Sequence, residues 1–528
     1  MIGFDLPPAR ATERPDRTGA CDGSARRDGL PLTQPARTQT QLLRQLELLG
    51  RSPLPSDERL KILEPLWQPI AFVQNECARR FVAKPLPLAA AEQSAYDAGQ
   101  LLWQMLGTNY LHCLQACARG RDDDKAALIA QRALAASAAA MKEAYLAGAR
   151  PEAAHWRRLH RIYRGAEELG VTRQAIGHGK IVAEGYIELL LIAAAHPFEL
   201  SPKQFSLVTA WAQRGAGKVA ILAAAPAESR TRPLIVDLAG DQPAAFGLDP
   251  EREAGPDWRW LDLGALRKSL KKRLIGLARG DSPESLQLGK ECLQPACEVL
   301  LKQVYRFWCK GGAGGDPAAG VSGGAACHLV GGIEAIHYFL SGHPFRQPGS
   351  RIQLSKREHE EIATFGRIAT RHSDDYGQQH AIEEWRTLGE NAAGLHLARA
   401  LARPGMRLSS GQLVAVQPDG TKGFMLGAVC WVASGQGQLD AGVRLLPGKP
   451  VPVALRGTGI TALNERFCPG FRLPAVERLH KPASVVMPKG YFRPDRVIEI
   501  YSDHARQIRL KHLLERGANF ESADFEWT

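Results

Sequence analysis

Residues 389–446 constrain the fold most, because short apolar runs alternate there with clusters of turn-forming residues. Runs such as 413–416 and 428–431 are only four residues long, and each lies close behind a glycine. Segments this short bury one face only by pairing with neighbours. The pattern predicts a small antiparallel β-barrel.

The chain before this region has helical periodicity. In residues 91–118 the apolar side chains of Leu102, Leu106, Tyr110 and Cys113 recur three or four positions apart, as on one face of a helix. Ser201 followed by Pro202, with Gln204 further on, predicts a capped helix start. At 528 residues the chain is too long for one core. We therefore predict an α+β multidomain protein, with a helical N-terminal region followed by the barrel.

Composition shifts along the chain divide it into five segments. We predict a disordered tail (1–33), a helical bundle or α-hairpin array (34–225), a mixed, mainly helical region (226–349) with a Gly-rich linker (311–324), a β-barrel (350–455) and a C-terminal β extension (456–528). Smaller predictions are a single strand at 234–238, a helix at 263–278, one or two further helices at 284–308, strands at 482–488 and 496–501, and a short helix or turn at 513–516. Residues 328–339 fit a strand or a helix equally well.

The net charge of +12 favours polyanionic partners such as nucleic acid, anionic membrane or a phosphorylated ligand. No dense Lys/Arg block with interleaved aromatic residues is present, so nucleic acid is not expected as a partner. The predicted helix 263–278 carries Arg267, Lys268, Lys271, Lys272 and Arg273. A solvated amphipathic face is favoured there over a docking face for membrane or nucleic acid.

Two further features predict a cytoplasmic setting. The N-terminal residues lack the basic-then-apolar layout of a signal peptide, and the longest apolar run, 187–195, is too short to span a bilayer. The ten cysteines are scattered; Cys113 and Cys117 share a helix face, whereas Cys292 and Cys297 do not. Without a second pair of ligands a zinc site is not expected, and we predict that the cysteines act as small hydrophobic residues in a reducing environment.

The order of the pieces in residues 389–446 resembles the PilZ domain, a bacterial β-barrel that usually senses cyclic di-GMP. A Gly-centred turn at 391–394 leads into 395–397, followed by the runs at 411–416, 427–431 and 442–445. The residue patterns of 186–198 and 259–263 are similar to those of the helical region that precedes the β domain in larger PilZ-type proteins. The resemblance implies a signalling receptor or adaptor.

The resemblance also implies a ligand site. PilZ domains grip the dinucleotide with Arg-x-x-x-Arg and with Asp/Asn-x-Ser-x-x-Gly, and here Arg367 and Arg371 match the first motif. The second motif ends at Gly394, with Asn391 in the place of Ser and Gly389 in the place of Asp or Asn. The implied ligand-binding residues are therefore Arg367, Arg371, Asn391 and Gly394.

Structural alternatives stand beside this assignment. Two arginines four positions apart arise readily by chance in an Arg-rich chain. For Gly394 a requirement of backbone geometry is favoured over ligand contact. Trp431 is expected in the core or at the barrel rim, and Arg444 on a solvated strand face.

No nucleophile–base pair or metal-ligand cluster can be assembled from the sequence, so we expect no enzyme activity, catalytic residue, metal or cofactor. The leading hypothesis is a cyclic di-GMP receptor that acts on an unidentified protein partner through its helical region. The alternative is a ligand-free adaptor or scaffold with a degenerate PilZ-like barrel.

Overall fold

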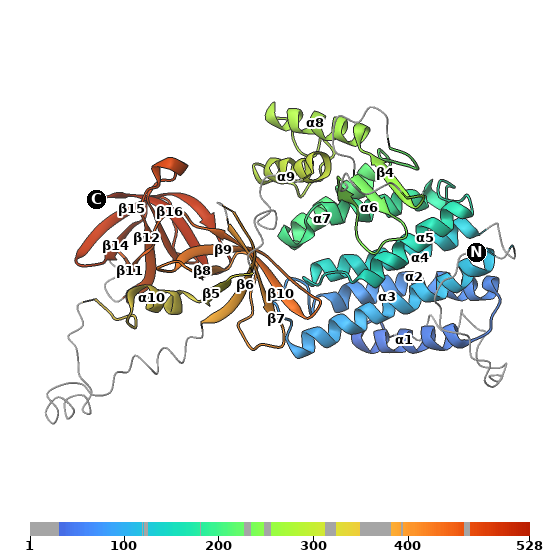
Figure 1. The fold of residues 1–528 in the computed structure, drawn as a ribbon, viewed down its shortest axis with the longest axis horizontal. Helices are drawn as coiled ribbons and strands as arrows, with labels where there is room; N and C mark the ends of the chain where they lie inside the picture. The colour runs from blue at the N-terminus through green and yellow to red at the C-terminus, as the bar shows by residue number, and fades with distance from the viewer. Residues whose placement is uncertain are drawn as a thin grey trace, which may run out of the picture. The chain divides into compact units, whose positions relative to one another are not determined.

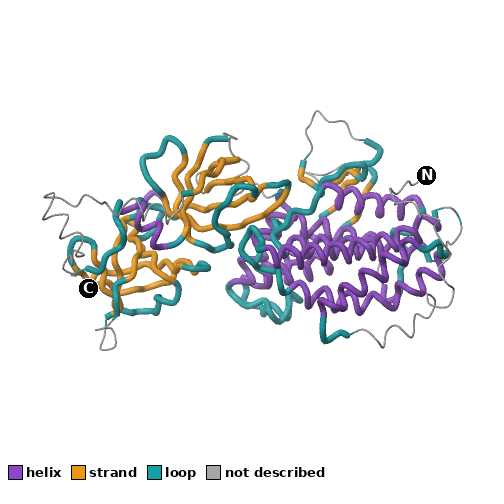
Figure 2. The backbone as a smooth tube through the Cα atoms, turned by 90° about the horizontal axis from the view of Figure 1, so that it is seen from below, coloured by secondary structure: helices purple, strands orange, loops and turns teal. Residues whose placement is uncertain are grey.

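The structure is a computed structural model, and it separates into two compact units. It describes residues 31–118, 120, 125–179, 181–225, 234–247, 255–311, 324–348, 382–391, 394–458 and 465–528. One unit comprises Met1–Lys84 and Leu88–Gly314, and the other Pro85–Pro87 and Gly315–Thr528. The first is built mainly of helices and the second mainly of strands (Figures 1 and 2). This confirms the predicted α+β multidomain architecture.

Long helices form most of the first unit. Their bounds are α1 Pro35–Arg51, α2 Ser56–Ala78, α3 Ala90–Cys117, α4 Ala126–Leu146, α5 Ala153–Glu168, α6 Val182–Ala194, α7 Pro202–Ala216, α8 Gly264–Ala278 and α9 Ala296–Lys310. The apolar period read from residues 91–118 lies on α3, where Leu102, Leu106 and Tyr110 are fully buried. The predicted start of α7 is also present, because the amide of Gln204 donates to Ser201 Oγ and the amide of Ser201 donates to Gln204 Oε1.

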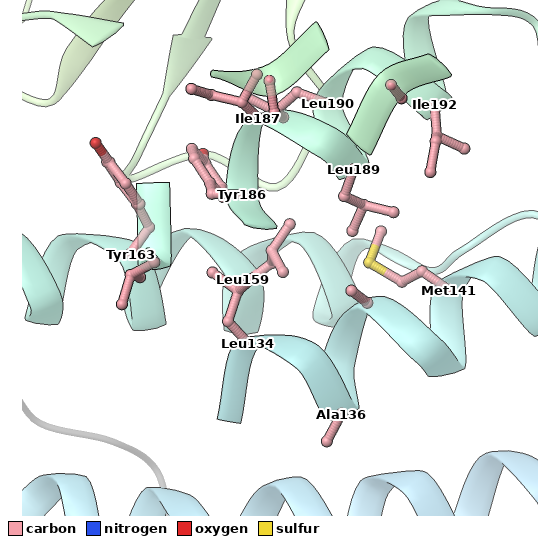
Figure 3. Close-up of a cluster of buried hydrophobic side chains, with 14 of the residues drawn as sticks. Leu134, Ala136, Met141, Leu159, Tyr163, Tyr186, Ile187, Leu189, Leu190 and Ile192 are labelled. Atoms are coloured by element: carbon pink, nitrogen blue, oxygen red, sulfur yellow. The ribbon is translucent and has the colours of Figure 1, made fainter. Parts of the chain in front are cut away.

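The core of the helical unit is continuous from α1 to α9. Figure 3 shows one part of it, where Leu134 and Met141 of α4 lie near Leu159 of α5 and Leu189 of α6. Tyr186 of α6 is fully buried here, and its hydroxyl lies 2.7 Å from Nδ1 of His160. This pair satisfies two buried polar groups across neighbouring helices.

A small sheet flanks these helices. Its strands are β1 Ala220–Leu222, β2 Leu234–Asp237, β3 Ala245–Phe246 and β4 Trp258–Asp262, in the order β1-β4-β2-β3. The strand predicted at 234–238 is therefore confirmed, but as one member of an antiparallel sheet. The helix predicted from residue 284 was placed too early, because α9 begins only at Ala296.

The first closed barrel lies in the second unit. Its strands are β5 Ala326–Gly331, β6 Glu383–Asn391, β7 Gly394–Ala400, β8 Leu413–Pro418, β9 Met425–Gly435 and β10 Gln438–Leu445, in the order β10-β7-β6-β5-β8-β9. The predicted start at residue 350 is corrected, because β5 closes the barrel by pairing with both β6 and β8. The ambiguous residues 328–339 divide between β5 and the helix α10, Ile333–Ser341.

The predicted C-terminal β extension is itself a second closed barrel. Its strands are β11 Val451–Gly457, β12 Cys468–Leu473, β13 Ser484–Pro488, β14 Val497–Tyr501, β15 Ala505–Arg516 and β16 Phe520–Trp527. The strands predicted at 482–488 and 496–501 are confirmed as β13 and β14. The helix or turn predicted at 513–516 is wrong, because these residues continue β15 and pair with β16.

Helix α10 ties the two barrels into one core. Its Ile336 is fully buried in a cluster that contains Leu413 and Leu426 of the first barrel and Phe471 and Phe520 of the second. The prediction of cysteines as small hydrophobic residues holds for Cys309 and Cys327, where burial raises the thiol pKa to about 12. It is wrong for Cys292 and Cys297, which form a disulfide between the segment before α9 and the first turn of that helix.

Two predicted regions fall largely outside the described residues, namely the tail 1–33 and the linker 311–324. Among the helices that the structure describes, none is both long and apolar enough to cross a bilayer.

Candidate functional site

The predicted ligand residues that the structure describes lie at the hairpin between β6 and β7. Asn391 ends β6 and Gly394 begins β7, and Oδ1 of Asn391 accepts a hydrogen bond of 3.0 Å from the amide of Gly394. Asn391 therefore stabilises the turn itself. The other two predicted residues, Arg367 and Arg371, lie outside the described residues.

Gly394 has a structural requirement of its own. It pairs with Arg444 of β10, and a Cβ added to it would overlap the carbonyl oxygen of Val443. That oxygen belongs to the backbone and cannot rotate away as a side chain can. The position therefore needs glycine whether or not a ligand binds, which agrees with the geometric alternative.

Alternation along the strands separates the two faces of the sheet at this hairpin. Leu395 and Leu397 of β7 and Val443 of β10 are buried toward the barrel interior. Because neighbouring residues of a strand point to opposite faces, His396 and Arg444 belong to the outer face. Both are only partly buried, which agrees with this assignment.

One row across the outer face combines two glycines with two aromatic rings. Gly389 of β6 pairs with His396 of β7, which pairs with Gly442 of β10 and through it with Trp431 of β9. The space a Cβ of Gly442 would need is filled by the indole ring of Trp431. The His396 and Trp431 rings meet edge to face, with centroids 5.1 Å apart. The absence of a side chain at Gly442 therefore leaves room for the indole ring of Trp431.

The next row carries the charge. Asn391, Gly394 and Arg444 are neighbours across β6, β7 and β10. The guanidinium of Arg444 forms an ion pair and hydrogen bond with Glu515, on β15 of the second barrel. The sequence predicted a solvated strand face for Arg444, and the structure keeps it on the outer face with 42% of its side chain exposed, where it also forms a charged link between the barrels. Nothing in the sequence marks this ion pair, because Glu515 lies 71 residues from Arg444.

The outer face thus brings together an amide, a guanidinium and two aromatic rings. An amide can hydrogen-bond the edge of a nucleobase, a guanidinium can bind phosphate, and rings can stack on a base. Sequence reasoning missed His396, and it placed Trp431 only as a core or rim residue. In the described parts of the chain, no group of three or more His, Cys, Asp or Glu side chains is arranged to hold a metal.

Comparison with known proteins finds similarity to one group of proteins. Residues 24–227 match the family described as "Cyclic-di-GMP receptor FimW, N-terminal domain", and residues 453–528 match "FimW C-terminal beta-barrel domain". The chain is 21% identical over 531 aligned residues to the protein named "Cyclic-di-GMP receptor FimW" of Pseudomonas aeruginosa. That alignment covers 89% of this chain and 84% of the relative. Both matched models and this relative carry the name FimW.

The matched families map onto the observed architecture at both ends. The first spans the helical region from before α1 to beyond β1, and the second coincides with the second barrel. The first barrel, with the hairpin of Asn391 and Gly394, lies between the two matched segments.

Proposed function

We propose that this chain is a cyclic di-GMP receptor whose first barrel binds the dinucleotide on the outer face of β6, β7, β10 and β9. The observation that carries the proposal is the meeting of Asn391, His396, Trp431 and Arg444 on one face of this barrel. The similarity of nearly the whole chain to a protein named as a cyclic di-GMP receptor supports it. So does the resemblance of residues 389–446 to PilZ domains.

Each residue of the proposed site binds the part of the ligand that suits its chemistry. The indole of Trp431 offers an apolar ring face for a guanine base, and the side chain of Asn391 reaches a guanine edge. The guanidinium groups of Arg367 and Arg371 hold the phosphates, because guanidinium is planar, permanently charged and able to bind two oxygens at once. Gly394 allows the backbones of β7 and β10 to approach closely beside the hairpin.

The receptor with its ligand bound then contacts a protein partner and changes the state of that partner. A ligand shifts such a receptor only by the difference in its affinity for two states. Arg444 offers one such difference, because a phosphate competes with Glu515 for its guanidinium. Binding that weakens this ion pair would alter the link between the two barrels of the β unit.

A ligand-free adaptor is the second candidate, and two observations favour it. Gly389 supplies no side chain at the position where PilZ domains carry Asp or Asn. Arg444 already has a carboxylate partner. In this reading the barrel serves only as a docking surface for proteins.

Isothermal titration of the full chain with cyclic di-GMP distinguishes the two. Arg371→Ala and Trp431→Ala should each weaken binding by about tenfold or more, since a charge-assisted contact or a stacked base contributes roughly 1.5–3 kcal/mol. Gly389→Asp should strengthen binding by restoring the polar group beside His396. Arg509→Ala is the matched control, because Arg509 is an exposed arginine on β15.

The outcomes separate cleanly. No heat from the wild-type chain would favour the adaptor. Wild-type binding that survives both Arg371→Ala and Trp431→Ala would reject this face as the site while leaving the receptor assignment intact.

A further inference from the structure

Helix α8 presents most of its cations on the side away from the core. Leu266, Leu270 and Leu277 are buried and attach the helix to the helical unit. The lysines at 268, 271 and 272 are exposed, as is Arg279 just beyond the last turn. The helix lies beside α9 (Figure 1). Its free side is therefore strongly basic.

A pocket of about 450 Å³ opens on this side, between α8 and the segment that follows it. The residues that line it are Lys268, Lys271, Lys272, Ile275, Gly276, Arg279, Asp281 and Leu286. Four of them are cations, and one, Asp281, is a carboxylate. The lining therefore carries a net positive charge, which favours an anion such as a phosphate group.

The wall opposite α8 is held in place by hydrogen bonds from behind. Arg273 Nε donates to the carbonyl of Leu286 at 2.9 Å, and Trp211 Nε1 of α7 donates to the carbonyl of Leu288 at 2.8 Å. Gly276 allows the close approach, because a Cβ there would overlap the side chains of Leu286 and Asp281. The pocket is thus a fixed feature of the fold.

Few carboxylates compete for these lysines. Glu284 lies on the same segment as Asp281, and its carboxylate lies 3.5 Å from Nζ of Lys290. Among the described residues, no ion pair within 4.0 Å is recorded for Lys268, Lys271 or Lys272. The cationic row is therefore poised for an anion from outside the chain.

We propose that this face of α8 docks the helical unit on an anionic phospholipid surface, with lipid phosphates in the pocket. From Lys268 to Arg279 the row extends about 16 Å at the rise of a helix, more than one small phosphate fills. Ile275 lies in the middle of the row with 44% of its surface exposed, so it can enter the interface between headgroups and acyl chains. This inference is independent of the cyclic di-GMP site.

Flotation of the full chain with vesicles tests the proposal. The vesicles are phosphatidylcholine alone, or phosphatidylcholine with about a quarter phosphatidylglycerol. We expect binding only to the second kind. Because each lysine near such a surface contributes about fivefold, Lys271→Gln with Lys272→Gln should weaken binding by about tenfold or more. Ile275→Ser should weaken it to a smaller extent.

The matched control replaces two exposed cations that do not line the pocket. Arg267 lies on α8 but outside the lining of the pocket, and Lys203 lies at the start of α7. Arg267→Gln with Lys203→Gln removes two positive charges, as the pocket variant does. This control should still bind the anionic vesicles as the wild type does. Thermal unfolding should be unchanged in both double variants, because all four side chains are exposed.

Three results would overturn the proposal. One is absence of wild-type binding to the anionic vesicles. Another is an equal loss in the pocket and control variants, which would show general charge attraction. The third is pocket-dependent binding of pyrophosphate or a single-stranded oligonucleotide by a chain that does not float with vesicles.

Discussion

The helical unit and the β unit differ in how far along the chain their core contacts reach. In the helical unit, consecutive helices such as α3 and α4 pack against each other. In the β unit, closure joins strands that are distant in sequence, as where β5 pairs with β8 and β11 with β14. A destabilising substitution in one helix should therefore have a local effect, whereas a destabilising substitution in one strand should disturb a whole barrel.

One buried ionisable group in each unit shows an opposite response to burial. In the helical unit Glu143 Oε1 accepts a hydrogen bond of 2.7 Å from Trp103, while its Oε2 is buried without a partner among the described residues. Burial raises the pKa of this carboxyl to about 7. In the β unit His337 is buried on α10 against Phe471. Burial, with the nearby His343, lowers the pKa of its imidazole to about 4. The contributions of these two groups to stability should therefore change with pH in opposite directions.

The largest expected effect is a break in barrel closure. Gly394→Ala should destabilise the β unit by about 3 kcal/mol, because the new Cβ overlaps the backbone of β10. Hydrogen exchange followed by mass spectrometry should show faster exchange in β6, β7 and β10 with the helices unchanged. Gly423→Ala is the control, because a Cβ at Gly423 meets no atom within 4 Å. Equal exchange in the two variants would contradict the closure argument.

The buried carboxyl gives the next effect. The raised pKa of Glu143 means that its stabilising contribution is complete below about pH 4.5 and is lost as pH rises through about 7. Glu143→Gln should therefore stabilise the helical unit by about 2 kcal/mol at about pH 8 and flatten its pH dependence. Exchange rates of α4 amides measure this. Glu291→Gln, at an exposed position, should change nothing.

The buried histidine should act in the other direction. The lowered pKa of His337 means that its contribution is complete above about pH 6.5 and is lost as pH falls toward about 4. With His337→Leu, the free energy of unfolding of the β unit should fall by about 1–2 kcal/mol less on acidification than it does in the wild type. His480→Asn, on an exposed turn, is the control. A variant that stays as acid-sensitive as the wild type would refute the assignment.

A local change in the helical unit gives the smallest effect. Ser201→Ala removes the side-chain cap of α7 and should cost about 1 kcal/mol. Exchange should rise in the first turn of α7 and leave both barrels unaffected. Loss of protection throughout the helical unit would show that its helices are less independent than proposed.

The same contrast explains what the sequence could predict. The helix α3 and the cap of α7 depend on neighbours within one or two turns, so period and spacing reveal them. The hairpin at Asn391 and Gly394 is local too, and it was placed correctly. The membership of β5 in the first barrel was missed, because its partners lie on β6 and β8, beyond residue 380.

Pairs of distant residues were likewise out of reach. The link between Arg444 and Glu515 joins residues 71 positions apart, and no periodicity marks it. His396 and Trp431 meet only because β7 and β9 flank β10. The disulfide of Cys292 and Cys297 was missed because both residues were judged as positions on one helix, whereas α9 begins only at Ala296.

The most direct test of the account is hydrogen exchange of the full chain with and without saturating cyclic di-GMP. We predict that the ligand protects the strands that carry the proposed site, which are Glu383–Asn391, Gly394–Ala400, Met425–Gly435 and Gln438–Leu445. The helix α8 should show no protection from this ligand. Protection confined to the helical unit, with these four strands unchanged, would contradict the central claim.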